Sequence, residues 1–263
     1  AALSISSGSV RIEQLHWTPG SWKTRGDFTG IALLPSTPAH AKDAPLQLGG
    51  HWQFDAAAQL TGELLIQRER GDWYLPGDVP QPLGLQQLQL QATARQGSLS
   101  GQFALNSGAL GSVQAEVALP LPPAKTPWPI AKESPLQGNI HATLTSLKWL
   151  NASGSNLHAD GELQIQAGIH GTLQQPDIHG TVSGTNLSLA LLEQGIRLQQ
   201  GTLAAHFQQA DLNIDRLHFA SPHAAPPDNR LFRDLALQDT AGSLTVSGKI
   251  GLTGASGQLD FSL

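Results

Sequence analysis

The sequence predicts an all-β protein built around a long, mostly antiparallel sheet. Apolar and polar residues alternate with a period of two in one segment after another, as in strands with one dry and one wet face. The 28 glycines and 17 prolines fall in or between these segments, where they indicate strand breaks and turns. The connections are also too short for crossover helices, which favours antiparallel pairing.

The first part of the chain contains three stretches of short alternating runs, at 10–34, 46–75 and 83–119. Each run places its apolar side chains on one side of an extended backbone, so each stretch predicts two or more strands. No amphipathic helix longer than two turns interrupts them. We therefore expect a β-rich segment over residues 1–119.

A proline-rich stretch follows, with five prolines in the eleven residues 119–129. Proline has no N–H to donate, so it cannot take part fully in a strand ladder. The sequence thus predicts a β-rich segment at 1–119, a linker or loop at 120–135, and a second β segment at 136–263. A second proline-rich stretch, 221–229, predicts a loop.

The sharpest alternation is LQIQAGIH, from Leu163 to His170. The same alternation returns downstream, and a strand of this kind cannot bury its apolar face alone. We expect these apolar residues to share one face and to line a hydrophobic groove. The candidate groove-lining residues are Leu163, Ile165, Ala167, Ile169, Leu187, Leu189, Leu191, Leu203, Ala205, Phe207, Leu244 and Val246.

Two short stretches leave a helical alternative open. The first is 146–151, which has no clear alternation. The second is 187–195, where a helix from Leu187 to Leu192 would end at Gly195 as its C-cap.

Composition excludes several classes of protein. Charged residues make up 13% of the chain, the net charge is −5 and no basic patch stands out, which argues against a nucleic-acid partner. There is no cysteine, hence no disulfide or thiolate metal site. No apolar run approaches the roughly 20 residues that a membrane-spanning helix needs. The chain has no methionine and starts with Ala1, so we expect it to be a piece of a longer protein.

The sequence contains no motif of nucleotide-binding loops, hydrolases or zinc proteases. The ten histidines lie singly along the chain, mostly at polar positions of strands, where a surface role is the simplest interpretation. We expect no catalytic residue, no cofactor and no metal. The six tryptophans lie near turns, and we expect them to plug the ends of a core or the mouth of a groove.

Segment 145–220 carries a more specific pattern. Gly161-Glu162-Leu163 precedes the run Ile169-His170-Gly171-Thr172-Leu173-Gln174-Gln175-Pro176-Asp177-Ile178-His179-Gly180. Together they resemble the unit G-x-L followed by v-x-G-T-L-x-x-P-x-(I/V)-x-G, which is found in the family of TamB, the translocation and assembly module subunit, and in the wider AsmA-like proteins. The resemblance covers about a third of the chain closely.

The resemblance implies a β-taco fold, a long curled sheet that forms a half-pipe with an apolar concave face. It also implies an internal or near-C-terminal piece of a protein anchored in the inner membrane of a Gram-negative bacterium. The body of that protein crosses the periplasm toward a TamA- or BamA-type outer-membrane barrel. The expected clients are phospholipid acyl chains or nascent outer-membrane β-strands, and the family has no catalytic residues to carry over.

Three functions stay open at this point. The first is a conduit that moves phospholipid or assists outer-membrane protein insertion. The second is a purely structural repeat module, such as an adhesin shaft, whose apolar core is sealed. The third is a carbohydrate-active β-protein that uses tryptophans as platforms, but it lacks paired acidic residues among aromatics. The first two differ in whether the apolar face is open or covered.

Overall fold

The structure is a computed structural model. It describes residues 4–5, 7–34, 45–57, 59–75, 81–121, 130–153, 157–191, 193, 196–209, 211–220, 243–251 and 259–262.

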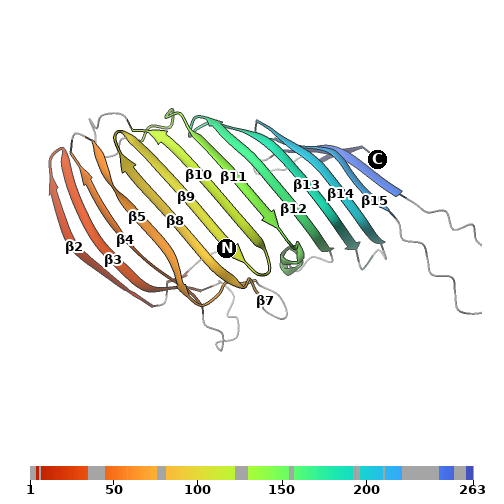
Figure 1. Cartoon of the computed structure of the whole chain (residues 1–263), viewed down its shortest axis with the longest axis horizontal. Helices are drawn as coiled ribbons and strands as arrows, with labels where there is room; N and C mark the ends of the chain where they lie inside the picture. Colours follow the sequence, from red (N-terminus) through yellow and green to blue (C-terminus); the bar gives the residue numbers. More distant parts are fainter. Residues whose placement is uncertain are drawn as a thin grey trace, which may run out of the picture.

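Nearly all of the described chain forms one antiparallel sheet of 15 strands (Figure 1). The strands follow one another in chain order, except that the first and the second both pair with the third. Its first strands are β1 (Ser4–Ile5), β2 (Ser9–Thr18), β3 (Ser21–Leu34), β4 (Leu46–Ala56), β5 (Leu60–Arg70), β8 (Leu85–Arg95), β9 (Ser98–Ser107) and β10 (Gly111–Pro120). It continues with β11 (Gln137–Leu144), β12 (Leu157–Gly171), β13 (Pro176–Leu191), β14 (Ile196–Gln209), β15 (Asp211–Ala220), β16 (Ser243–Gly251) and β17 (Leu259–Ser262).

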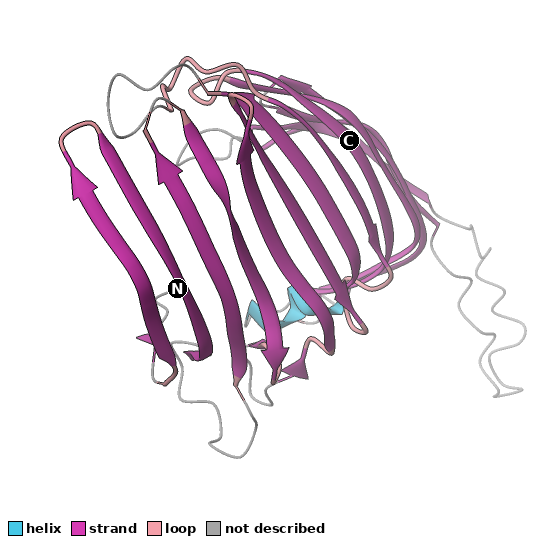
Figure 2. Ribbon diagram, turned by 60° about the vertical axis from the view of Figure 1, so that its left-hand side comes forward, coloured by secondary structure: helices cyan, strands magenta, loops and turns pink. Residues whose placement is uncertain are grey.

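Three short elements lie outside this sheet. The strands β6 (Tyr74–Leu75) and β7 (Gln81–Pro82) pair only with each other, and η1 is a 3-10 helix at Lys148–Ser153. The predicted all-β, antiparallel sheet is confirmed. The sheet is open rather than closed, and it is not strongly curled (Figure 2).

The two helical alternatives have different outcomes. Residues 187–191 are not helical, because β13 continues as a strand to Leu191. The period-two spacing of their leucines follows the sheet and not a helical turn. Residues 192, 194 and 195 of the predicted helix and its cap lie outside the described residues. The stretch 146–151 does contain helical turns, which form η1 in the connection between β11 and β12.

The sheet is continuous across the proline-rich connection. Strands β10 and β11 pair directly, from Gly111 opposite Leu144 to Ala118 opposite Gln137. Residues 122–129 and the predicted loop at 221–229 lie outside the described residues.

β-Bulges keep the apolar residues on one side of the sheet. Along β13 the register shifts between Gly184 and Leu187, and Asn186 within the shift has a φ of 53°. One extra residue reverses the alternation. Val182 at an even position and Leu189 at an odd one therefore lie on the same face.

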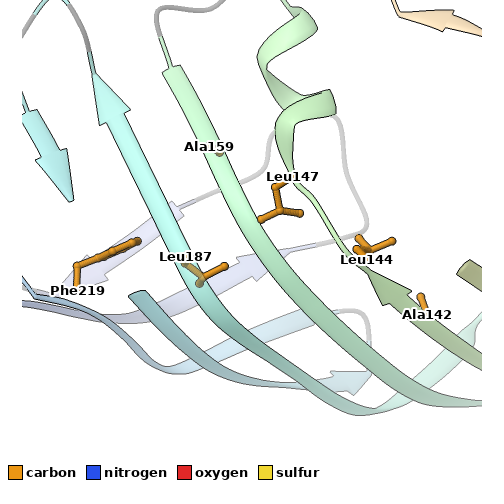
Figure 3. Close-up of a cluster of buried hydrophobic side chains, with 6 residues drawn as sticks. All are labelled: Ala142, Leu144, Leu147, Ala159, Leu187 and Phe219. Carbon is orange, nitrogen blue, oxygen red and sulfur yellow. The ribbon is translucent and has the colours of Figure 1, made fainter. Parts of the chain in front are cut away.

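The core consists of side chains on one face of this sheet, packed in part against connections between strands. A cluster of buried side chains gathers over β11 to β15, and Leu147 lies between the strands that carry Leu144 and Ala159 (Figure 3). The cluster consists of Ala142, Leu144, Leu147, Ala159, Leu187 and Phe219. Within the described part of the chain, no large side chain is less than 2% exposed. The apolar side chains thus pack mainly against their lateral neighbours.

Candidate functional site

One face of the sheet is apolar from one edge to the other, and we call it the apolar face. A single row of directly opposite residues crosses the sheet from β2 to β17 without a polar side chain. The row is Val10, Phe28, Gly50, Ile66, Leu90, Phe103, Ala115, Ile140, Ala167, Gly180, Phe207, Leu212, Ile250 and Leu259.

The opposite side of the sheet, the polar face, has the reverse composition. The neighbouring row on this face is Arg11, Asp27, His51, Leu65, Gln91, Gln102, Glu116, Asn139, Gly168, His179, Gln208, Asp211 and Gly251. Leu65 is its one large apolar member. Acidic partners hold two histidines of this face, with His206 Nδ1 2.9 Å from Asp215 and His179 Nε2 2.9 Å from Asp177.

The register places all twelve candidate groove-lining residues on the apolar face. Ile165 lies opposite Val182, and Val182 lies opposite Ala205. Near the C-terminal end of the sheet, Leu244 and Val246 of β16 lie opposite Phe219 and Leu217 of β15. The role of these residues in lining a groove stays a prediction.

The same face extends through strands that carry none of the twelve candidates. In β5, β10 and β11 the register adds Leu64, Ile66, Val113, Ala115, Ile140 and Ala142. Their alternation is visible in the sequence, but only the pairing across β10 and β11 joins the two halves into one surface.

Exposure along the apolar face depends on lateral neighbours. Small residues inside the sheet lie between larger ones and are buried, as for Ala167 at 7% and Ala205 at 4% exposed. At the β2 edge, where a neighbour is missing on one side, Leu15 is 71% and Trp17 69% exposed. Trp17 is therefore not a core plug, which was one of the two roles predicted for the tryptophans.

Aromatic rings of the apolar face lie in close contact with glycines of the neighbouring strand. A Cβ built on Gly26 would overlap the Trp52 ring, and a Cβ on Gly50 would lie 2.9 Å from Phe28 Cζ. The rings of Phe28 and Trp52 stack with their centroids 6.4 Å apart and an interplanar angle of 29°. These glycines let bulky side chains cover backbone instead of standing above the surface.

Few polar side chains fall on the apolar face, and two of them are satisfied locally. Thr24 Oγ1 accepts a hydrogen bond from Trp52 Nε1 at 3.0 Å. Ser107 donates its hydroxyl proton to the Leu83 carbonyl and accepts the Leu110 N–H at 3.0 Å. Bulge residues aside, the remaining polar ones in the described strands are Gln209 and Arg68, and Arg68 alone is charged.

At one end of the apolar face, the β11–β12 connection covers the part of β12 that extends beyond Leu144. Asn151 Oδ1 accepts the Ala159 N–H at 2.7 Å. The connection thus provides a hydrogen-bond partner for the part of the β12 edge that does not pair with β11. Leu147 of the same connection packs into the buried cluster. The connection therefore covers this end of the face.

The carboxylate of Asp160 anchors this connection. It accepts hydrogen bonds from the Ser146 hydroxyl and the Gly161 N–H, both at 2.9 Å, and Lys148 Nζ lies 3.3 Å away. Partial burial acts to raise the pKa of Asp160. The hydrogen bonds from Gly161 and Ser146 and the charge of Lys148 outweigh it and lower the pKa below its ordinary value.

Neither a cluster of possible metal ligands nor a helix able to cross a membrane is present in the described residues. No group of three or more His, Asp or Glu side chains there is arranged to hold a metal ion. No described helix has the length and apolar character needed to cross a membrane. Comparisons with protein-family models, with curated proteins and with solved structures found no significant match to this chain.

Proposed function

We propose that the chain is a conduit segment whose apolar face guides phospholipid acyl chains, or the apolar strands of an incoming outer-membrane protein, through water. The observation that supports this most is the uninterrupted apolar row from β2 to β17, on a sheet with no second strand layer in its described part. A conduit of this kind needs no catalytic group. It needs only an apolar surface that is continuous.

The energetics favour such a surface. An acyl chain exposed to water costs about 0.8 kcal/mol per CH₂, so a chain of fifteen carbons resists transfer by roughly 12 kcal/mol. A surface that stays apolar lowers this barrier at each step along it. With strands about 4.8 Å apart, the sheet offers a path of roughly 60 Å before twist.

The setting of this conduit is part of the proposal. The G-T-L-x-x-P unit at 171–176 supports membership of the TamB and AsmA-like family. In that family the sheet is a half-pipe with its apolar side concave. The parent protein would then reach from an inner-membrane anchor through the Gram-negative periplasm to a TamA- or BamA-type barrel.

The main competitor is a structural module with a sealed apolar face. Leu147 favours it locally, because this residue covers part of the face next to Leu144 and Ala159. Leu46, Leu85 and Leu119 are also buried. Most other large side chains of the face are half-buried, and those of β2 are exposed. Exposed apolar area of this extent is typical of an interaction surface.

One substitution separates these two functions. Leu189 lies on the apolar face and is half-buried. On an open face an arginine at this position can extend its guanidinium to water while its stem covers apolar surface. In a sealed core the unpaired charge would cost several kcal/mol and unfold the segment.

The test compares Leu189→Arg with Thr181→Arg, which adds the same charge at an exposed position on the polar face of the same strand. Each purified protein is mixed with phospholipid vesicles, separated from them, and analysed by native mass spectrometry for bound lipid. We expect both variants to fold, and only Leu189→Arg to lose bound phospholipid. Unfolding of Leu189→Arg, or equal lipid content in both folded variants, contradicts the conduit.

A further inference from the structure

Arg68 is the one charged side chain that the register assigns to the apolar face in the described strands, bulge residues aside. It lies two residues before the end of β5. Leu48 on β4 is directly opposite, and Ile66 precedes it on the same face. The side chain is half-buried. A cation thus lies among apolar groups at one end of the strands.

No carboxylate among the described residues forms an ion pair with Arg68. Its Nε donates to the Gly71 carbonyl at 3.0 Å. The two acidic residues nearest in sequence accept from backbone amides instead. Glu69 accepts the Gly30 N–H at 2.8 Å, and Asp72 accepts the N–H groups of Trp73, Gly84 and Leu85.

Of the side-chain nitrogens of Arg68, only Nε has a hydrogen-bond partner among the described residues, so the two Nη groups can bind a ligand. The bond from Nε to Gly71 fixes one side of the guanidinium at the end of the strand. The four remaining N–H donors form a planar fork, which matches the oxygens of a phosphate. Solubility alone does not explain an arginine on the apolar face. Arg70, two residues later, already places a positive charge on the polar face of β5.

We propose that Arg68 binds the phosphate of a phospholipid whose acyl chains lie along the apolar face. This inference rests on the proposed conduit function and specifies its client as a phospholipid. The headgroup lies at the strand end near Gly71, where water is accessible, and the chains contact Leu48 and Ile66. Arg68 then marks a point at which lipids enter, leave or pause.

Three probes separate the contributions of the phosphate headgroup and the acyl chains to binding. Dihexanoylphosphatidylglycerol, used below its micelle concentration, has both groups. Dihexanoylglycerol has the same two chains without phosphate, and glycerol 3-phosphate has the phosphate without chains. Each is titrated calorimetrically into the wild-type chain, Arg68→Gln and Arg70→Gln, and circular dichroism confirms that each variant folds.

Arg70→Gln is the matched control. It removes the same charge two residues away, on the polar face, where Arg70 Nε donates to Gln47 Oε1 at 2.6 Å. We expect Arg68→Gln to weaken binding of the phospholipid by about tenfold, as for loss of charge-assisted hydrogen bonds. Binding of dihexanoylglycerol should stay unchanged, and Arg70→Gln should bind all probes like the wild type. Arg68→Lys, which keeps the charge without the fork, should fall between wild type and Arg68→Gln.

Several results would overturn the assignment of Arg68 alone. They are equal phospholipid affinity in wild type and Arg68→Gln, an equal loss in Arg70→Gln, or glycerol 3-phosphate binding as tightly as the phospholipid. If Arg68→Gln does not fold, wild-type affinity for the phospholipid in Arg68→Lys would contradict binding of the phosphate by the planar guanidinium. If the wild type binds neither lipid, the conduit function itself fails for phospholipid.

Discussion

The ring of Phe219 in β15 lies against the backbone of Gly201 in β14. A Cβ placed on Gly201 would overlap this ring, and it would also lie 2.7 Å from Leu187 Cβ. Phe219 is 4% exposed. The glycine therefore leaves room for a large aromatic side chain to be buried against the backbone of the neighbouring strand.

Replacement of Gly201 by alanine should displace Phe219 and destabilise the fold. Overpacking of this kind costs about 1–3 kcal/mol, which urea unfolding can measure. The matched control is Gly168→Ala on the polar face of β12, where the nearest atom to a new Cβ is His170 Nε2 at 3.5 Å. We expect the control to be neutral or stabilising by up to about 1 kcal/mol. Equal loss in the two variants would contradict the packing of Phe219 on Gly201.

The Asp160 carboxylate predicts a pH dependence of stability. Its pKa is lowered in the folded state, so its contribution is present above the unfolded-state value of about 3.9 and is lost as pH falls through the folded-state value. We expect Asp160→Asn to be less stable than the wild type at pH 7. The difference should shrink toward pH 3, as measured by urea unfolding at each pH.

The control for this experiment is Glu162→Gln, an exposed carboxylate two residues along the same strand. It removes one negative charge without touching the bonds to Ser146 and Gly161. A stability difference between Asp160→Asn and the wild type that is the same at pH 7 and pH 3 would refute the role of the ionised carboxylate.

The β2 edge predicts association between chains. Among the described strands, this one pairs with β3 alone, and its apolar side chains Val10, Ile12, Leu15 and Trp17 are 58–71% exposed. Edge strands with unpaired backbone groups and apolar side chains tend to add a further strand. We expect sedimentation velocity to detect concentration-dependent dimers, and the double variant Ile12→Lys with Leu15→Lys to stay monomeric.

A second double variant separates apolar contact from charge. Gln14→Lys with His16→Lys adds charge to the polar face of the same strand. It should still dimerise if the apolar face drives association. If it stays monomeric as well, charge repulsion along the edge explains the result and the prediction fails.

The sheet and its two faces could be predicted from alternation alone in regular strands such as β12. The bulges at which the apolar residues switch between even and odd positions were harder to predict. Asn186 and Gln200 adopt positive φ values of 53° there, and no glycine marks these bulges. The apolar residues on either side of a bulge still belong to one face, because the burial of apolar side chains determines the register.

Lateral neighbours explain what the sequence could not predict. Ile12 and Ile165 look alike in an alternating run, yet Ile12 is at an edge and Ile165 has strands on both sides. Arg68 was missed for a different reason. Arg68 is at an even position, like Leu64 and Ile66, so continued alternation predicts that it lies on the apolar face. A charged residue at the end of an alternating run, however, usually indicates a turn.

The central claim is that the apolar face is open to a lipid client, and accessibility at position 165 tests it most directly. The chain has no native cysteine, so Ile165→Cys and Gln166→Cys each give a single thiol, on the apolar and polar faces respectively. Maleimide labelling of the folded proteins is followed with and without dihexanoylphosphatidylglycerol. We predict that Ile165→Cys reacts more slowly than Gln166→Cys, and that the lipid slows only Ile165→Cys. An Ile165→Cys thiol that is unreactive without lipid, or whose rate the lipid leaves unchanged, would contradict an open conduit.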